Sequence, residues 1–324
     1  MLSEVMTYFG LVKGLRQAGY YETTEHKQFF KELKAATQSG SLVALTGVIG
    51  CGKTTTLRKL FEVLLKENKV LVSKSLSVDK NRTTLITLIS ALFYDLSPNY
   101  KETKIAAQGE KRERELRDLI KKAKKPVVLF VDEAHDLSYT TLKGLKRLIE
   151  VIEDGEGKLT VVLAGHPKLK NDLRRPTMEE IGYRSTLFTL EGMVGSQREY
   201  ITWLIKSCII EGGKIEDILT IEAIELLSEK LRTPLQIQQH LTLAMESAYQ
   251  VGEKPITKAI VESVLSKQID DLEPRLTRHG YDVRSLAEQF NAKPTEIKAL
   301  LRGQLDAARR KELADQMLSA GLPM

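Results

Sequence analysis

Glycine, lysine and threonine recur between residues 47 and 54 at a spacing that suits the binding of phosphate groups. The segment reads G-x-x-x-x-G-K-T, which is the P-loop pattern. Glycines let such a loop bend until its N–H groups converge on phosphates, and the helix after it adds positive potential. Lys53 is expected to reach the β- and γ-phosphates of a nucleotide, and the Thr54 hydroxyl to ligate Mg²⁺. The alternative is a glycine-rich turn that binds nothing. The predicted nucleotide-binding residues are Gly47, Val48, Ile49, Gly50, Cys51, Gly52, Lys53, Thr54 and Thr55.

Two carboxylates, Asp132 and Glu133, follow the apolar run 127–131. A buried strand that ends in this pair resembles the Walker B segment of nucleotide hydrolases. Asp132 is expected to hold Mg²⁺ through water, and Glu133 to orient and polarise the attacking water. Turns also favour Asp, so it is the combination with the P-loop that favours a catalytic interpretation.

One histidine and several arginines complete the list of candidates. His166 follows the apolar run 159–164 and is predicted to contact the γ-phosphate or the water, as a sensor; a histidine that only caps the strand end is the alternative. Arg184 precedes another apolar segment and is predicted to act as an arginine finger in a neighbouring subunit's site. Arg174 and Arg175 are rival candidates, and any of the three could instead make a surface contact.

Short apolar runs alternate with longer helical stretches from residue 41 onward, a pattern typical of a parallel sheet covered on both faces. The expected fold class is therefore α/β, with five strands in an αβα arrangement. Glu273-Pro274 is expected to interrupt the helical pattern. The predicted strands are 42–46, 70–74, 127–131, 159–164 and 186–190. The predicted helices are 110–124, 200–208, 220–230, 234–249 and 258–267.

Four regions follow from these patterns. A helical lead-in is expected over 1–40, a nucleotide-binding core over 41–192, an all-helical lid over 193–268 and a small helical tail over 269–324. The tail has helix-turn-helix spacing, with Thr295 expected as the N-cap of its second helix. If it binds DNA, Thr295, Lys298 and Arg302 would face the groove or the phosphates. Residues 267–324 hold ten Lys and Arg against nine Asp and Glu, so docking to a protein partner is an equal alternative.

Composition limits the class of protein. The chain has 324 residues, of which 42% are hydrophobic and 28% charged, as in globular proteins. It lacks a long uncharged apolar run and a secretory signal pattern, so we expect no membrane span and a cytoplasmic location. Its two cysteines, Cys51 and Cys208, agree with a reducing compartment. The net charge of +6 is compatible with a polyanionic partner and equally with none.

Taken together, these motifs resemble those of the AAA+ ATPases. Within that class the chain is similar to the ATPase subunits of DNA transposition systems, namely the TniB, TnsC and Mu B group with the ExeA-like and IstB-like proteins. The closer likeness lies in residues 24–40, in Val131-Asp132-Glu133-Ala134-His135 and in residues 164–169. The resemblance implies an AAA+ P-loop fold, ATP and Mg²⁺ as cofactors, and ATP hydrolysis.

The resemblance also implies partners. Such subunits assemble head to tail into a filament or ring on duplex DNA and act on a transposase, here expected to be of the DDE type. The loop residues that would contact the DNA backbone are Lys80, Arg82 and Lys101. Tyr20, Tyr21 and His26 are candidates for the adenine pocket.

One departure from the family pattern concerns the lid. Relatives carry an arginine near the start of a lid helix, whereas here Leu235 and Gln236 follow Arg232-Thr233-Pro234. Gln236 can contact the nucleotide but supplies no charge, which predicts slow intrinsic hydrolysis stimulated by oligomerisation, DNA or the transposase.

The leading functional hypothesis is an ATP-dependent, sequence-neutral DNA-binding regulator of transposition. The alternatives are a secretion-assembly ATPase of the ExeA type, a replication-initiator or helicase-loader ATPase, and a scaffold that binds nucleotide without cleaving it.

Overall fold

A parallel five-stranded sheet forms the centre of the chain. The computed structural model describes residues 3–75, 83–97, 105–182, 184–265 and 271–324. The strand order is β2-β3-β4-β1-β5, and all four neighbouring pairs are parallel. This confirms the predicted fold class, and each predicted strand agrees with the structure to within one residue at either end. The strands are β1 (Leu42–Thr46), β2 (Leu71–Lys74), β3 (Val127–Val131), β4 (Leu159–Gly165) and β5 (Ser185–Thr189).

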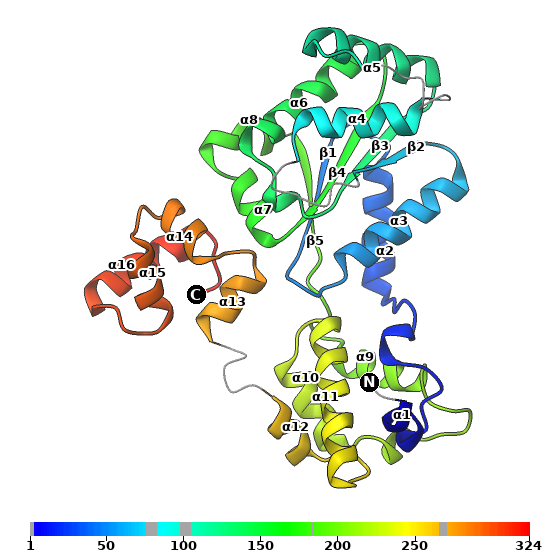
Figure 1. The fold of residues 1–324 in the computed structure, drawn as a ribbon, viewed down its shortest axis with the longest axis vertical. Helices are drawn as coiled ribbons and strands as arrows, with labels where there is room; N and C mark the ends of the chain where they lie inside the picture. Colours follow the sequence, from blue (N-terminus) through cyan, green and yellow to red (C-terminus); the bar gives the residue numbers. More distant parts are fainter. Residues whose placement is uncertain (1–2, 76–82, 98–104, 183, 266–270) are drawn as a thin grey trace.

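Helices cover both faces of this sheet, because alternate side chains of each buried strand point to opposite sides. Val127, Leu129 and Val131 of β3 pack in one apolar cluster, whereas Val128 and Phe130 pack in another. The first cluster holds the side chains of α4 to α8, and the second those of α2 and α3 (Figure 1). These helices are α2 (Thr24–Ala36), α3 (Lys53–Glu67), α4 (Leu85–Leu96), α5 (Gly109–Ala123), α6 (Tyr139–Asp154), α7 (Pro167–Leu173) and α8 (Glu179–Gly182).

A separate helical lid follows the sheet. Its apolar cluster includes side chains of α9 (Gln197–Lys206), α10 (Ile221–Lys230), α11 (Pro234–Val251) and α12 (Lys258–Val264). Val5 and Phe9 of α1 (Ser3–Phe9) belong to this same cluster, and Figure 1 shows α1 beside the lid helices. The expected lead-in is therefore divided, since α1 packs with the lid and α2 with the sheet.

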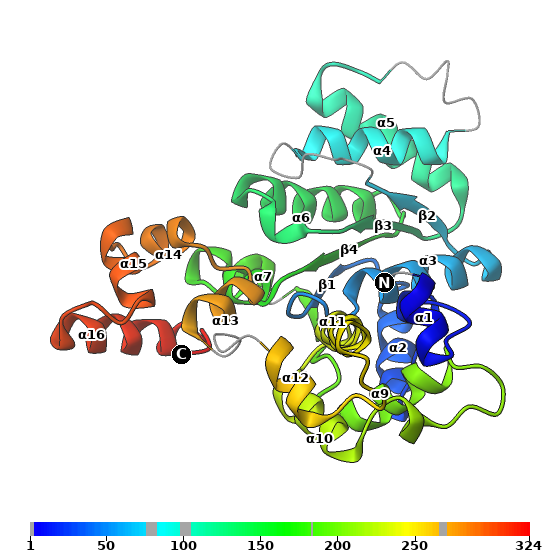
Figure 2. The ribbon, with the colours of Figure 1, turned by 60° about the horizontal axis from the view of Figure 1, so that its bottom comes forward.

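The last segment of the chain, residues 271–324, is called the tail below. Its helices are α13 (Leu272–Arg278), α14 (Val283–Gln289), α15 (Pro294–Leu301) and α16 (Ala307–Ser319). They enclose an apolar cluster of their own, and both views show the tail beside α7 (Figures 1 and 2).

Two local expectations about the tail are wrong. Pro274 does not interrupt a helix, because it lies in the first turn of α13, where the backbone N–H has no helical partner to lose. Thr295 is not the N-cap of α15. Lys293 is, with Pro294 at the first position and the Glu296 carboxylate accepting the Lys293 N–H at 2.8 Å.

Candidate nucleotide site

The P-loop joins the carboxyl end of β1 to the first turn of α3. Gly50 and Gly52 have φ values of +81° and +106°, in the left-handed region that favours glycine. Lys53 is buried, and its Nζ donates to the carbonyl oxygens of Gly47 at 2.8 Å and Val48 at 3.1 Å. Within the described residues Nζ forms no ion pair with a carboxylate, so a bound phosphate would supply the missing counter-charge. The loop thus fits a nucleotide.

Thr54 and Asp132 come together from α3 and from the end of β3. The Thr54 hydroxyl donates to Asp132 Oδ2 at 3.0 Å, and the Glu133 N–H donates to Asp132 Oδ1 at 2.9 Å. Mg²⁺ prefers hard oxygen ligands such as this hydroxyl and carboxylate. The pair predicted from sequence as the metal site is therefore adjacent in space and fits a hydrated Mg²⁺.

Glu133 lies between two histidines. Its Oε2 is 3.4 Å from His135 Nδ1 and 3.6 Å from His166 Nε2. The imidazole rings stack with their centroids 3.8 Å apart and their planes 17° apart. Glu133 itself has a φ of +56°, so the backbone turns sharply just where the carboxylate is presented.

Both histidines are held in the neutral form near neutral pH. Burial lowers the pKa of His166 to about 3, and the positive charges of Lys53 and of a protonated His135 would oppose its protonation further. Burial also lowers the pKa of His135, although Asp136 and Glu133 act in the opposite direction. A neutral imidazole can both donate and accept a hydrogen bond, which suits a group next to a water-activating carboxylate.

The same three side chains contain enough donor atoms for a metal ion. However, the lone pairs of imidazole lie in the ring plane, so two rings stacked nearly parallel direct them side by side rather than toward one ion. The geometry instead places both imidazoles beside the Glu133 carboxylate, at 3.4 and 3.6 Å. Sequence reasoning gave His135 no role, although its position two residues after Glu133 was the available signal.

A cavity of about 100 Å³ lies where the lead-in meets the P-loop and the lid. Tyr20, Tyr21 and His26, the candidates for the adenine pocket, line it together with Thr55 of α3 and Gln238 of α11. Gln238 Nε2 donates to the Tyr200 hydroxyl at 2.8 Å, and burial raises the pKa of Tyr200 to about 12. The cavity thus joins aromatic rings to a side-chain amide, a combination suited to a heterocyclic base.

The first turn of α11 closes over the P-loop. The Leu235 N–H donates to the Gly50 carbonyl at 3.3 Å, and a Cβ on Gly50 would come within 2.6 Å of Leu235 Cβ. Gln236 is not among the residues that line the small cavity. Its Oε1 instead accepts the N–H groups of Arg232 and Thr233 at 3.1 and 3.2 Å, which caps the helix.

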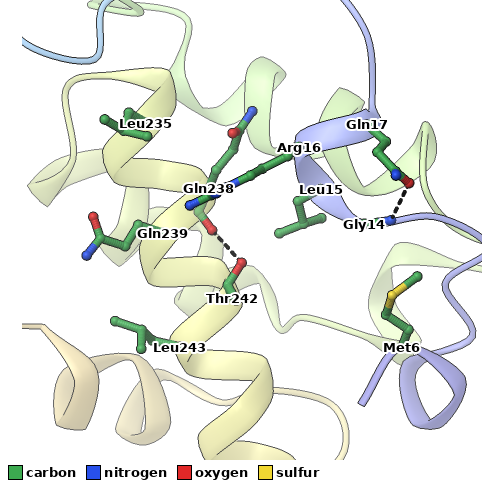
Figure 3. Close-up of a pocket in the computed structure, with 10 residues that line it drawn as sticks. All are labelled: Met6, Gly14, Leu15, Arg16, Gln17, Leu235, Gln238, Gln239, Thr242 and Leu243. Atoms are coloured by element: carbon green, nitrogen blue, oxygen red, sulfur yellow. Dashed lines mark hydrogen bonds between the residues drawn. The ribbon is translucent and has the colours of Figure 1, made fainter. Parts of the chain in front are cut away.

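A second cavity, of about 590 Å³, separates the lead-in from α11 (Figure 3). In Figure 3, Arg16 extends from the lead-in toward Gln238, and Leu235 and Leu243 project from α11. None of the residues that line this cavity belongs to the P-loop, so it is not the space for the phosphates.

The candidate arginines lie away from the P-loop of their own chain. Arg184 precedes β5, is 64% exposed and pairs with Glu150 of α6. Arg175 pairs with Asp172 at 2.8 Å, and Arg174 is exposed. Lys298 and Arg302 are exposed on and just after α15, whereas Lys80, Arg82 and Lys101 lie outside the described residues.

Comparison with known proteins agrees with this geometry. Residues 36–173 match the family model described as an AAA domain. Over 168 residues the chain is 29% identical to general secretion pathway protein A of Aeromonas hydrophila. That match covers 51% of this chain and 30% of the relative, so the chain spans less than a third of the relative's length.

Two solved structures share the fold at 15% identity. The Aeropyrum pernix ORC2 protein, in its ADPNP–ADP complexes, has a TM-score of 0.59, with 97% of this chain and 91% of that chain covered. Drosophila ORC bound to DNA has a TM-score of 0.55, with 97% and 82% covered. The fold is that of an AAA+ ATPase. The P-loop, Asp132 and Glu133 meet at one edge of the sheet, an arrangement that supports ATP hydrolysis. We call this edge, formed by the carboxyl ends of β1, β3 and β4, the nucleotide edge.

None of the helices in the described part of the chain combines the length and the apolar character needed to cross a bilayer.

Proposed function

We propose that this AAA+ ATPase is an ATP-dependent regulator of DNA transposition. It assembles head to tail on duplex DNA, without sequence preference, and recruits or activates a transposase. Glu133 polarises the water in this scheme, Lys53 and the loop amides hold ATP, and Thr54 and Asp132 hold Mg²⁺. His166 reports on the γ-phosphate.

The position of Arg184 is the observation that best supports the proposed assembly of several copies. Ser185 pairs with Leu42 at the amino end of β1, whereas the P-loop follows Thr46 at its carboxyl end. At about 3.3 Å per residue, roughly 17 Å of strand separates Arg184 from its own P-loop. An arginine that stabilises the charge of phosphoryl transfer here has to enter the site of a neighbouring copy. Repetition of that contact builds a ring or a filament.

The net charge of the chain and its similarity to a structure solved with DNA support DNA as the partner. The net charge of +6 and the exposed Lys298 and Arg302 favour a polyanion, and one protein of the same fold was solved bound to DNA. The transposition role rests on the resemblance of residues 131–135 and 164–169, which contain Glu133, His135 and His166, to the transposition ATPases.

Slow intrinsic hydrolysis belongs to the same proposal. Gln236 stands where relatives carry an arginine, and its side-chain oxygen is engaged in capping α11. The lid therefore contributes no charge from this position, and stimulation has to come from assembly, DNA or the transposase.

Electron microscopy with duplex DNA and a slowly hydrolysed ATP analogue tests the proposal. We expect a helical coat or stacked rings on DNA with the wild-type chain, and bare DNA with Lys53→Ala. Assemblies of Lys53→Ala indistinguishable from those of the wild type would refute control by ATP.

A secretion-assembly ATPase is the second candidate, favoured by the match to general secretion pathway protein A. This second function predicts that no ordered assembly forms on DNA, whether ATP, ADP or no nucleotide is bound. The same micrographs therefore discriminate between the two functions.

A further inference from the structure

The tail lies directly against the nucleotide edge. The Ile49 N–H, in the P-loop, donates to the Arg278 carbonyl at 3.0 Å. The Lys168 N–H, just after His166, donates to the His279 carbonyl at 3.2 Å. The Asn171 side-chain amide donates to the Tyr281 hydroxyl at 2.7 Å. Three groups at the end of α13 and just after it thus contact the P-loop and α7, the helix that follows His166.

Gly280 makes this approach possible. It has a φ of +89°, and a Cβ on it would lie 2.6 Å from His166 Cβ and 2.7 Å from His166 Nδ1. The backbone of the tail therefore rests on the side chain of the candidate sensor, and His166 Nδ1 is buried without a hydrogen-bond partner.

The contact between the tail and the nucleotide edge has features that allow it to open. The apolar cluster of the tail has no residue in common with the clusters that cover the sheet, so the tail has a core of its own. A cavity of about 530 Å³ also separates α14 from α7, lined by Lys168, Asp172, Ser285 and Glu288 among others. The hydrogen bonds from Ile49, Lys168 and Asn171 therefore help to hold the tail in place.

We propose that the tail is an autoinhibitory element, and that its docking and the binding of ATP exclude one another. The Ile49 N–H belongs to the loop whose amides are expected to hold phosphate, and it is bonded to a tail carbonyl instead. The partial negative charges of the Arg278 and His279 carbonyls also oppose a triphosphate at this edge. Binding of ATP displaces the tail and uncovers the nucleotide edge for a second copy. The inference rests on the proposed function only in requiring that ATP binds at this loop.

Tyr281→Phe tests the competition in the full-length chain. It keeps the ring in the tail's apolar cluster but removes the hydroxyl that accepts from Asn171. Because ATP binds only the undocked form, the apparent Kd for a fluorescent ATP analogue should fall by roughly two- to tenfold. Tyr249→Phe is the matched control, because its hydroxyl makes one long, exposed contact to Glu4 at 3.4 Å on the lid. An affinity in Tyr281→Phe equal to those of the wild type and the control would overturn the proposal.

Hydrogen exchange in the wild-type chain gives a second test that needs no variant. The Lys168 amide is protected by the His279 carbonyl, so saturating ATP analogue should accelerate its exchange. Unchanged or slower exchange at Lys168 would show that nucleotide and tail bind together, against the inference. Neither measurement involves DNA or a transposase. The role in transposition can therefore be refuted while the autoinhibitory role of the tail is supported, and the autoinhibitory role can be refuted while the role in transposition is supported.

Discussion

Glu133 is the residue to which we assign the role of catalytic base. Asp132 lies beside it with Thr54 for the metal, and two neutral imidazoles flank its own oxygen. Burial lowers the pKa of both histidines, to about 3 for His166, so these imidazoles are weakened as bases and Glu133 remains the candidate base.

Replacement of Glu133 by Gln should therefore separate binding from hydrolysis. The amide retains the size of the side chain but cannot polarise water as a base, so kcat should fall by about 100-fold or more. The Kd for ATP should stay within about twofold of the wild-type value. Steady-state hydrolysis and nucleotide titration measure the two quantities. Glu153→Gln, at an exposed position on α6, is the control. A Glu133→Gln chain that no longer binds ATP would remove the catalytic assignment.

Acid should destabilise the chain in part through His166. The pKa of this residue is lowered from an ordinary 6.5 to about 3, so the unfolded chain takes up the proton first as pH falls. Stability is then lost between about pH 6.5 and 3, with a slope that approaches about 1.4 kcal/mol per pH unit for one group. His166→Asn should reduce this slope in urea unfolding at pH 7 and 4.5. The free energy of unfolding of the wild type and of His166→Asn should change equally between pH 7 and 8.5. If both proteins lose the same stability between pH 7 and 4.5, the lowered pKa of His166 is contradicted.

For single residues, the sequence predicted that the P-loop, Asp132 and Glu133 lie close together, because motif spacing on buried strands leaves few places for the side chains. It could not predict the stacked His135, which depends on the unusual backbone of Glu133. Gln236 was predicted to contact the nucleotide, whereas its side chain caps α11. The sequence does not show whether such a side chain bonds to a helix end or to a ligand, because this depends on the tertiary structure.

Among the lid helices, α11 contacts the P-loop directly. Its N-cap is Thr233, whose buried Oγ accepts the Gln236 N–H at 3.3 Å, and its first turn touches Gly50. The strands were predictable as short apolar runs, whereas α13 was not, because a proline signals a break and a first helical turn equally.

Thr233→Ala should lower the free energy of unfolding by about 0.5–2 kcal/mol, since it removes this cap. It should also weaken ATP binding, because the first turn of α11 no longer holds its place over the loop. Thermal unfolding and nucleotide titration report the two effects. Thr257→Ala provides the comparison, because Thr257 precedes α12 without capping it through its side chain. Equal losses in both variants would mean that the Thr233 cap has no special importance.

In the assembly that we propose, Arg184 acts across the interface between two copies of the chain. Arg184→Ala should reduce hydrolysis by the assembly on the order of 10³-fold while the affinity of single subunits for ATP stays normal. Mixing Arg184→Ala with Glu133→Gln subunits should restore part of the activity, because some interfaces then combine an intact Glu133 with an intact Arg184. Hydrolysis assays of the mixtures on DNA measure this, with each variant alone as the control. Mixtures no more active than the single variants would show that Arg184 does not act across the interface.

The divided lead-in ties the lid to the sheet domain twice. The chain leaves the lid cluster after Leu15 and reaches α2 by way of Gly19, Tyr20 and Tyr21, and it returns from β5 by way of Leu190 and Met193. Two covalent connections restrict the relative movement of the lid and the sheet more than one would. Residues of both connections line the small cavity. We therefore expect a base bound there to restrict the movement of the lid.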